Sequence, residues 1–289
     1  MKVLVTGGSG FIGSAVVNRL KAEHAVHVLS SRRKSVVMTH ECDLLSAASV
    51  KSFVDHLAGD GFDALIHLAA ITCSAENRLK ISLLDENNII TANVIEIARA
   101  LRPKMFIHAS SMAVFPNCNG IYTEDSLINP AANGDGLYGL AKFNAEVMLD
   151  FFLAAQMPVT HLRLSQVYGP GMVRDRIIPS MMREWREKGA ITVYGNGERV
   201  TNFIHVRDVV EAFVRVLAAP KQGVFNIAAS RHWSFFELAQ MIIGSMGSKE
   251  MRIILEPKGS RVQQRIDATR FNATYGFSAD CVDFAGIEA

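Results

Sequence analysis

Thr6-Gly7-Gly8-Ser9-Gly10-Phe11-Ile12-Gly13 joins an apolar run at 2–6 to a helical pattern that starts at Phe11, and this stretch decides the fold. It fits G-x-G-x-x-G through Gly8, Gly10 and Gly13, and G-x-x-G-x-x-G when Gly7 replaces Gly8 as the first glycine. Glycines let the backbone turn sharply, approach a pyrophosphate and pack the helix against the strand. The free N–H groups at the helix start then attract phosphate. We predict a dinucleotide-binding turn; the alternative is a glycine-rich turn without a ligand.

Short apolar runs alternate with longer helical patterns on both sides of this turn. Strands are predicted at 2–6, 26–29, 64–68, 105–109 and 159–164, with helices between them at 11–22, 47–57, 87–101 and 138–155. Strands that alternate with helices of this length indicate βαβ units, hence a parallel sheet covered on both faces. The predicted fold class is a doubly wound α/β Rossmann fold, with ligands beyond the carboxyl ends of the strands.

The rhythm changes at Gly169-Pro170-Gly171. Helical patterns follow at 177–188, 206–218 and 235–245, with brief strands at 191–194 and 224–227. We predict a dinucleotide-binding domain at 1–170 and a smaller mixed α/β substrate lobe at 171–289, with an approximate boundary and some chain crossing between the lobes. The site is expected in the cleft between the two.

Composition excludes several classes of protein. The 289 residues are 49% hydrophobic and 20% charged with a net charge of +2, so we expect neither disorder nor a nucleic-acid partner nor a membrane partner. The four cysteines form no C-x-x-C pair, and no histidine cluster has zinc-ligand spacing, so no metal is expected. No apolar run reaches the roughly 18 residues of a membrane span, and the amino terminus does not resemble a signal peptide. We expect a cytoplasmic protein with reduced thiols.

The end of the second strand bears on cofactor choice. NAD sites usually carry a carboxylate here for the ribose 2′-hydroxyl, whereas NADP sites supply cations for the 2′-phosphate. Ser30 occupies the expected position, and Arg32 and Arg33 follow. Arginine binds phosphate with two parallel hydrogen bonds. NADP(H) is therefore favoured and NAD(H) is the alternative; the less favoured explanation of the two arginines is a solvated basic loop.

Tyr138 and Lys142 lie four residues apart near the start of a predicted helix, and this spacing places them on one face. A phenol is a poor base at neutral pH, but a neighbouring lysine and a cationic nicotinamide would lower its pKa and allow proton exchange with a substrate. Ser110 and Ser111 end the preceding strand, where a hydroxyl could hold the reacting oxygen; alternatively they only satisfy backbone groups. His67, His108 and His205 are more simply explained as structural histidines.

These residues together resemble the extended short-chain dehydrogenase/reductases, in their nucleotide-sugar epimerase/dehydratase group. Thr6 to Gly13 resembles the family's cofactor turn, and Ser111, Tyr138 and Lys142 match its catalytic triad. Asn87 with Thr91 resembles its central helix. With the second-strand position, the resemblance implies cofactor contacts from Gly7, Gly8, Gly10, Phe11, Ile12, Gly13, Ser30, Arg32, Arg33, Asp43, Leu44, Leu68, Ala69, Ala70, Asn87, Tyr138, Lys142 and Tyr168. The stretches 193–197 and 202–208 resemble the sugar-nucleotide lobe.

The resemblance implies hydride transfer at a sugar carbon, C4 of the hexose. Tyr138 would move the proton, Lys142 would bind the nicotinamide ribose and Ser111 would position the oxygen. The family's dehydratases carry an acidic pair after the catalytic hydroxyl and its decarboxylases a Glu, but here Met112 and Ala113 follow, which disfavours both eliminations. Thr201 replaces an arginine that often binds the substrate diphosphate, so the candidates for the substrate are Arg199, Asn202 and Arg261.

Three functions remain open on the sequence. The two arginines favour a 4-keto-sugar reductase that binds NADPH, reduces once and releases NADP⁺. A nucleotide-sugar 4-epimerase, similar to UDP-glucose 4-epimerase, would instead retain its NAD and return the hydride to the other face. A dinucleotide-binding sensor or scaffold without turnover is the third, and the intact triad argues against it.

The helices at 87–101 and 138–155 are expected to pair with their copies in a homodimer, as the resemblance implies. The second of them repeats apolar residues beyond what one core-facing stripe needs. The alternative is that both helices simply cover the sheet.

Overall fold

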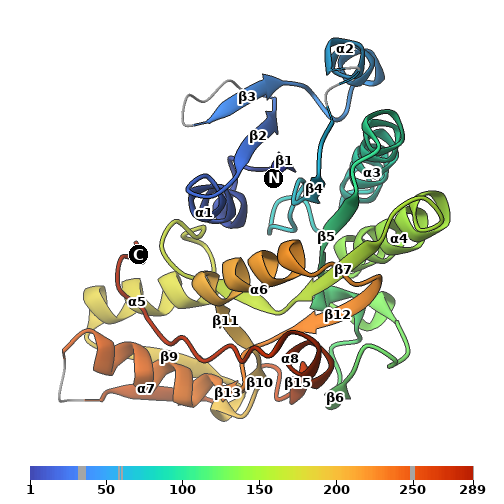
Figure 1. Ribbon diagram of the computed structural model, residues 1–289. Coiled ribbons are helices and arrows are strands. Elements are labelled where there is room, and N and C mark those ends of the chain that lie inside the picture. The colour runs from blue at the N-terminus through green and yellow to red at the C-terminus, as the bar shows by residue number, and fades with distance from the viewer. Residues whose placement is uncertain (32–36, 58, 60, 248–250, 289) are drawn as a thin grey trace. The chain divides into compact units, whose positions relative to one another are not determined.

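The computed structural model describes residues 1–31, 37–57, 59, 61–247 and 251–288 (Figure 1). The chain falls into two compact units. The first unit contains 1–116, 127–164 and 210–225, and the second contains 117–126, 165–209 and 226–289. The chain therefore passes between the units several times.

A seven-stranded sheet forms the centre of the first unit, in the order β12-β7-β5-β4-β1-β2-β3. From β3 to β7 every neighbouring pair is parallel. The predicted doubly wound parallel sheet is thus confirmed. Its inner strands are buried along most of their length, as parallel sheets require, whereas the edge strand β3 is partly exposed. The strands are β1 (Lys2–Thr6), β2 (Ala25–Ser30), β3 (Met38–Glu41), β4 (Ala64–His67), β5 (Met105–Ser111), β7 (Val159–Leu164) and β12 (Gly223–Ile227).

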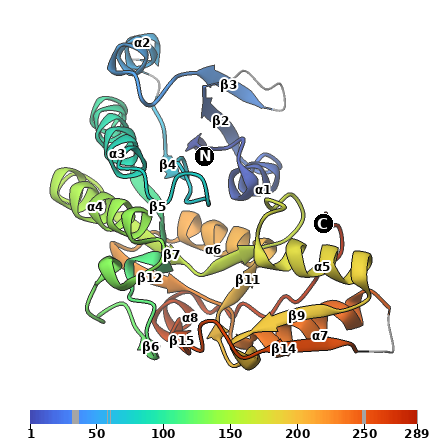
Figure 2. The same cartoon turned by 180° about the vertical axis from the view of Figure 1, so that it is seen from behind.

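Helices α2 (Ala47–Leu57), α3 (Ser82–Leu101) and α4 (Gly136–Leu153) lie on one side of this sheet, and α1 (Phe11–Leu20) lies on the other (Figures 1 and 2). Two short 3₁₀ turns, η1 (Met112–Val114) and η2 (Pro130–Ala132), precede α4. The apolar stripes of α2, α3 and α4 pack on the sheet in one buried cluster that includes Phe53, Val94 and Leu149. This cluster fixes the position of α4, the helix that carries Tyr138 and Lys142.

The sheet face under α4 changes from apolar to polar toward its carboxyl edge. Leu4, Leu65, Phe106 and Val159 are in register across β1, β4, β5 and β7, and all belong to the apolar cluster. Two residues further along each strand, on the same face, Thr6, His67, His108 and His161 are in register. We call these four buried residues the polar row. A row of three histidines inside a parallel sheet needs internal hydrogen bonds, because water does not reach it.

The second unit is built from short paired strands and helices around its own core. The core includes Tyr168, Trp233 and Phe284. Helix α7 (Phe235–Ser245) begins with a capping box, in which Ser234 and Glu237 exchange side-chain to backbone hydrogen bonds. The strand pairs are β6 (Gly120–Tyr122) with β15 (Gln264–Ile266), β8 (Gln166–Tyr168) with β11 (Phe203–His205), β9 (Ile191–Tyr194) with β14 (Ile253–Glu256), and β10 (Val200–Thr201) with β13 (Trp233–Ser234). The helices are α5 (Ile177–Lys188), the 3₁₀ turn η3 (Gly195–Gly197), α7 (Phe235–Ser245) and α8 (Thr269–Tyr275).

One element differs in place from the sequence-based expectation. The strand predicted at 224–227 forms, as β12, but it joins the edge of the main sheet beside β7. Helix α6 (Val206–Ala218) brings the chain back to the first unit from residue 210 onward. The hydrophobic pattern of a segment predicts that it forms a strand, but it does not predict which other strand it pairs with. The pairing of β12 with β7 could therefore not be predicted.

Candidate active site

The glycine turn has the close backbone contacts that exclude side chains. Gly7 has φ +71°, and a Cβ there would lie 2.6 Å from the Ala69 nitrogen; at Gly13 it would lie 2.1 Å from the Gly7 carbonyl oxygen. Gly10 donates its N–H to that same carbonyl at 3.0 Å and precedes α1 without any side-chain cap. No acidic residue lies in the first turn of α1. The turn thus combines a cradle without side chains and an uncapped helix start, which fits a pyrophosphate.

The end of β4 lies beside this turn. The Ala69 N–H donates to the Thr6 hydroxyl at 3.3 Å, and the Leu68 N–H donates to the Thr6 carbonyl at 3.1 Å. Leu68, Ala69 and Ala70 are partly exposed, so they are available to a ligand. Asn87 is buried, and its amide accepts from the Ile71 N–H and donates to the carbonyls of Ile71 and Leu83. Asn87 therefore holds the backbone of the loop that follows β4.

The residues expected to choose between NAD and NADP are only partly described. Ser30 ends β2, is half-buried and accepts the Cys42 N–H through its carbonyl at 2.9 Å. Arg32 and Arg33 lie outside the described residues. Asp43 is exposed, and one of its carboxylate oxygens accepts the Leu45 N–H at 2.9 Å. The Leu44 carbonyl accepts from the Asn93 amide at 2.8 Å. Asp43 and Leu44 thus form an ordered turn on the way to α2.

The predicted triad lies where β5 ends and α4 begins. The Lys142 Nζ is 5.8 Å from the centre of the Tyr138 ring and donates to the Ala109 carbonyl at 2.8 Å. The Ser111 hydroxyl accepts the Ala113 N–H at 3.1 Å and caps η1. A Cβ at Gly139 would lie 2.1 Å from the Ala113 carbonyl oxygen, so only glycine lets α4 approach this turn. Sequence reasoning did not identify Gly139 as a site residue, although a glycine between Tyr138 and Lys142 indicated a close backbone contact at this point of the helix.

Lys142 is buried, and this burial changes its chemistry. Desolvation lowers the pKa of Lys142 to about 8, against a smaller opposing effect from the Glu146 carboxylate. The lysine is therefore mostly cationic at neutral pH and loses its proton when the pH rises above about 8. A cation beside the phenol stabilises the anion that remains when Tyr138 gives up its proton.

A buried ion pair follows one turn further along α4. Glu146 accepts from the Arg163 guanidinium at 2.9 and 2.7 Å and from the Ser110 hydroxyl at 2.5 Å. Both charged side chains are 4% exposed, and Arg163 lies over the Phe115 ring at 5.2 Å. Tyr138, Lys142, Glu146 and Asp150 are each four residues apart, so they form one polar stripe along α4. The spacing of the carboxylates was visible in the sequence, but their partners on β5 and β7 were not.

The polar row continues this network under α4. His67 is hydrogen-bonded to the Thr6 hydroxyl at 2.7 Å and stacks on His108 with ring centres 5.6 Å apart. The Nδ1 atoms of His108 and His161 are 3.0 Å apart, and His161 Nε2 lies 3.1 Å from the Asp150 carboxylate. Burial, and then the Lys142 cation, hold the pKa of His67 at about 3 and lower that of His108 well below its ordinary value.

In the second unit, two of the predicted ligand contacts are core residues. Tyr168 is fully buried and stacks on Phe284 at 5.4 Å; burial also raises the pKa of its hydroxyl. Asn202 has no exposed surface and bonds to Ser165, Ala229 and Arg231. Contacts from Tyr168 to the cofactor and from Asn202 to the substrate therefore find no support in the geometry. Sequence motifs do not distinguish a side chain that binds a ligand from one that holds the backbone.

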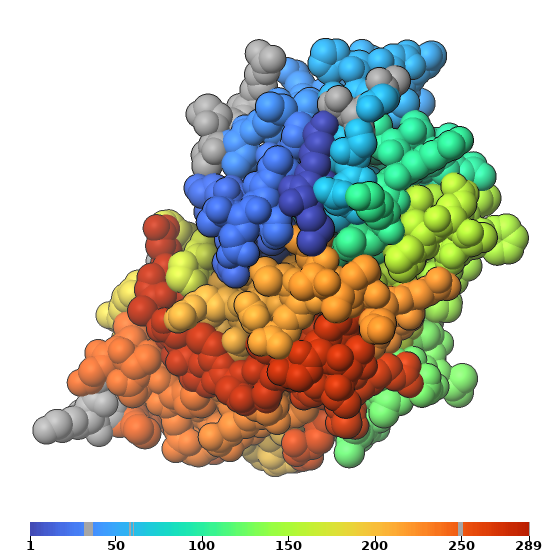
Figure 3. Space-filling model, viewed as in Figure 1, coloured from blue at the N-terminus to red at the C-terminus, as the bar shows by residue number. Residues whose placement is uncertain are grey.

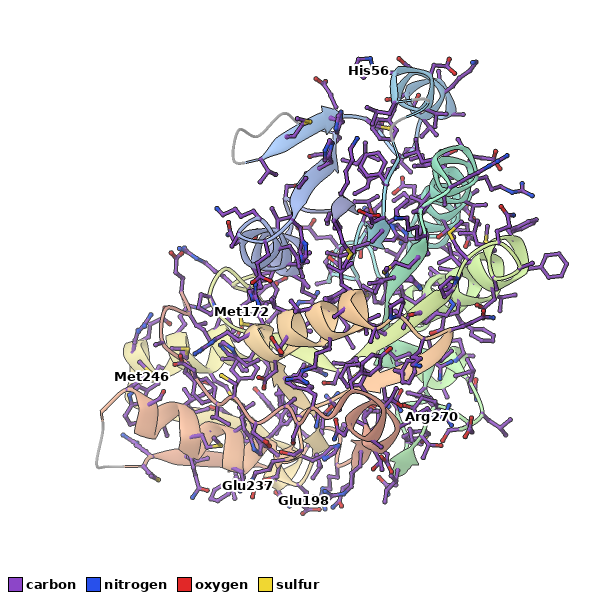
Figure 4. The ribbon with its side chains drawn as sticks, in the orientation of Figure 1. His56, Met172, Glu198, Glu237, Met246 and Arg270 are labelled. Carbon is purple, nitrogen blue, oxygen red and sulfur yellow. The ribbon has the colours of Figure 1, made fainter. Side chains whose placement is uncertain are left out.

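The two candidate arginines of the second unit have more accessible positions. Arg199 lies over the Phe235 ring at 5.0 Å. Arg261 is exposed, donates to the Pro257 carbonyl at 3.3 Å and lies 3.8 Å from Glu198, which Figure 4 labels. Both flank the η3 turn, where a Cβ at Gly195 would lie 2.3 Å from the Ser260 carbonyl oxygen. Arg199 is half-buried and Arg261 is exposed, so both guanidinium groups lie closer to solvent than the side chains of Tyr168 and Asn202.

Within the described residues, no group of three or more His, Cys, Asp and Glu side chains could hold a metal ion. No helix in the described part of the chain is long and apolar enough to cross a membrane.

Comparisons with known proteins agree with this geometry. The chain is 28% identical to dTDP-4-dehydro-6-deoxy-D-allose reductase of Streptomyces bikiniensis, over 95% of this chain and 90% of that protein. A UDP-glucose 4-epimerase from Thermotoga maritima, solved with UDP-glucose, has the same fold with a TM-score of 0.83 at 23% identity, over 98% and 94% of the two chains. MoeE5, solved with UDP-glucose and NAD, has a TM-score of 0.80 at 26% identity over the same shares.

A profile of the NAD-dependent epimerase/dehydratase family matches residues 3–228, most of the chain, and this range includes the glycine turn, Ser111, Tyr138 and Lys142. The predicted resemblance is confirmed: the chain belongs to this family of extended short-chain dehydrogenase/reductases, whose members act on nucleotide sugars.

Proposed function

We propose that this protein reduces the C4 keto group of a nucleotide-activated sugar with NADPH. The observation that carries the proposal is the group formed by Ser111, Tyr138 and the buried Lys142. The two residues that follow Ser111 in sequence, Met112 and Ala113, are apolar. A hydroxyl, a phenol and a cation suffice for hydride transfer coupled to one proton transfer. Elimination of water or carbon dioxide needs a further acid or base, and η1 offers none.

In this mechanism the bound nicotinamide supplies the hydride, and the chain supplies orientation and the proton. Tyr138 gives its phenolic proton to the oxygen that develops negative charge at C4. Lys142 stabilises the resulting phenolate, and Ser111 donates a hydrogen bond to the same oxygen. The Ala109 carbonyl holds the Lys142 ammonium in place at 2.8 Å, so the charge does not need to be organised during the reaction.

For the cofactor we favour NADP(H) over NAD(H). Ser30 lacks the carboxylate that would accept the ribose 2′-hydroxyl, and Arg32 and Arg33 follow it in sequence. In the pyrophosphate turn, a Cβ at Gly7 or Gly13 would meet backbone, which supports a close backbone approach. For the substrate we assign the diphosphate to Arg199 and Arg261, which flank the η3 turn.

A 4-epimerase is the second candidate, because the same triad can oxidise C4 and then reduce it again. Such an enzyme would retain NAD throughout the cycle. The relative with the name of a reductase, aligned over 95% of this chain, favours the first candidate. A sensor or scaffold without turnover is the third, and a polar network as complete as that around Lys142 argues against it.

We also propose a homodimer through α3 and α4. Val147 and Phe151 on α4 are 51% and 82% exposed, and Ile89 on α3 is 44% exposed. In Figure 3 these two helices, in green and yellow-green, lie side by side on the surface. Large apolar side chains on adjacent helices are typical of a covered interface. Sedimentation velocity tests this: Phe151→Glu should convert a dimer into a monomer, and a wild-type monomer would refute it.

One experiment separates the three functions. Purified protein is denatured, and the supernatant is analysed for dinucleotide. A reductase should release little and should bind NADPH from solution when native, whereas tightly held NAD⁺ would indicate the epimerase. Absence of affinity for both dinucleotides would refute both enzymes.

A second experiment tests the choice of cofactor. Arg32→Ala with Arg33→Ala should weaken NADPH binding and leave NADH binding unchanged. Equal effects on the binding of the two dinucleotides would contradict the NADP assignment.

A further inference from the structure

A pocket of about 680 Å³ lies in the second unit, between α5, α7 and the tail at 282–287. All the described residues that line it belong to this unit. Its volume falls within the range of roughly 300–1,000 Å³ that is usual for small-molecule sites. Neither the triad nor the η3 turn is among its described lining residues, so the proposed function gives this pocket no role.

Most of the lining is apolar and continuous with the core of the second unit. Met182 on α5 and Phe284 in the tail belong to that core, and Met241 on α7 packs against it. Met246, which Figure 4 labels, follows the end of α7 and packs against the same core. Methionine side chains adapt to the shape of a ligand, and their sulfur atoms make favourable contacts with aromatic rings. The lining therefore suits a flat aromatic group.

The tail that forms one wall of the pocket is held at both ends. Before this wall, the Cys281 N–H donates to the Asp208 carboxylate at 2.8 Å. After it, Glu288 forms an ion pair with Arg174. The wall is thus in place before a ligand arrives, and a preformed site loses less conformational entropy on binding.

One cation at the pocket has no protein partner. Arg186 on α5 is exposed and forms no hydrogen bond or ion pair within the part of the chain that the structure describes. By contrast, Arg183 on the same helix does not line the pocket and donates to the Ser180 hydroxyl at 3.4 Å. A guanidinium binds a carboxylate through two parallel hydrogen bonds. Arg186 is therefore available to an anionic group on a ligand.

Asp283 limits how much negative charge that group can carry. It is the acidic residue among the described lining residues, and its carboxylate accepts the Ala285 N–H at 2.8 Å. Arg186 and Asp283 carry one positive and one negative charge, so their formal charges cancel. A dianion would hold its second charge near Asp283 without a counter-charge, whereas a monocarboxylate needs only Arg186.

We propose that this pocket binds a small aromatic monocarboxylate. The aromatic group packs against the methionines and Phe284, and the carboxylate pairs with Arg186 on the exposed side. The site uses none of Ser111, Tyr138 and Lys142, so the proposal stands independently of the proposed function. A ligand that binds only the folded second unit also stabilises it.

The first test compares two probes that share a ring system and differ in charge, 2-naphthoate and its neutral amide. Calorimetry of the wild-type protein should give a Kd of about 0.1 mM for 2-naphthoate, as expected for a ligand of this size. The amide should bind about tenfold more weakly, because it lacks the charged hydrogen bonds.

Two matched variants test the role of the cation. Arg186→Gln should weaken 2-naphthoate about tenfold and leave the amide unchanged. Arg183→Gln, which removes a cation from the same helix outside the pocket, should change neither affinity. Equal affinities of the two probes for the wild-type protein would overturn the proposal, as would a loss in Arg186→Gln that Arg183→Gln reproduces. Failure of 2-naphthoate to bind at about 1 mM would also overturn it.

The second test locates the probe. In protein labelled with ¹³C at the methionine methyl groups, 2-naphthoate should shift the signals of Met182, Met241 and Met246 and leave that of Met105 on β5 unchanged. Met241→Gln should weaken both probes by a similar factor, because it changes only the contact with the ring. Shifts that spare the pocket methionines would overturn the proposal. Displacement of 2-naphthoate by UDP would assign the pocket to the nucleotide and would overturn it as well.

Discussion

The two units place their polar residues differently. In the first unit, Lys142 and Glu146 of the polar stripe on α4 are buried, with hydrogen bonds to Ala109 and Arg163, respectively. In the second unit the candidate arginines lie near the surface around η3, while the buried polar residue, Asn202, holds backbone together. A fixed charge near the reacting atoms can be preorganised, whereas a diphosphate can be bound by side chains that move to meet it. Under the proposed function, the difference teaches that burial separates the proposed catalytic cation, Lys142, from the proposed substrate-binding arginines.

The largest effect should come from the phenol in the first unit. Tyr138→Phe removes only the proton donor, so we expect kcat to fall by about a hundred- to ten-thousand-fold, with nearly unchanged affinity for NADPH. Steady-state turnover of a nucleotide 4-keto sugar measures it. Tyr275→Phe, on α8 of the second unit, is the matched control and should retain kcat. Near-normal turnover of Tyr138→Phe would refute the proton-transfer assignment.

Breaking the buried Glu146–Arg163 ion pair should lower stability more than breaking an exposed ion pair. Glu146→Gln leaves the Arg163 guanidinium buried without a counter-charge, so the free energy of unfolding should fall by about 3–5 kcal/mol. Glu211→Gln breaks a half-exposed pair with Arg215 on α6 and should cost less than about 1 kcal/mol. Denaturant unfolding of both variants gives the comparison. Equal losses would mean that the burial of the Glu146 pair has no energetic consequence.

In the second unit, burial predicts that one residue affects stability and another affects substrate binding. Asn202→Ala leaves the Ala229 N–H and the Ser165 hydroxyl without their partner, and should cost about 2–3 kcal/mol of unfolding free energy. Arg261→Ala should change stability by less than about 0.5 kcal/mol but should raise KM for the nucleotide sugar. Thermal unfolding and initial rates distinguish the two. A raised KM in a fully stable Asn202→Ala would restore the original substrate-binding interpretation.

The last prediction concerns pH. Burial lowers the pKa of Lys142 to about 8 from an unfolded value near 10.5, so between these values the unfolded chain binds more protons than the folded one. The stability contribution of this lysine should therefore rise as pH increases from about 8 to 10.5, while kcat for reduction falls above about pH 8 as the cation is lost. Lys142→Met should abolish both trends. A flat rate profile to pH 10 would contradict the role of the cation.

The sequence predicted the features whose parts lie close together in the chain. The glycine turn spans Gly7 to Gly13, and the Tyr138–Lys142 pair spans one helical turn, so local geometry alone fixes them. The partners of Glu146 on β5 and β7, and the polar row, depend on strand register and became visible only in the fold. Tyr168 and Asn202 matched family motifs, but a motif does not say whether a side chain faces a ligand or a core.

The most direct test of the proposed function follows the hydride. Purified protein is given a nucleotide 4-keto sugar and NADPH that carries deuterium at C4 of the nicotinamide, and the product is analysed by mass spectrometry and NMR. We predict stoichiometric NADP⁺ and a 4-hydroxy sugar with one deuterium at C4, with no such product from Tyr138→Phe. An unlabelled product, or interconversion of 4-hydroxy epimers with no net oxidation of NADPH, would contradict the proposed reductase.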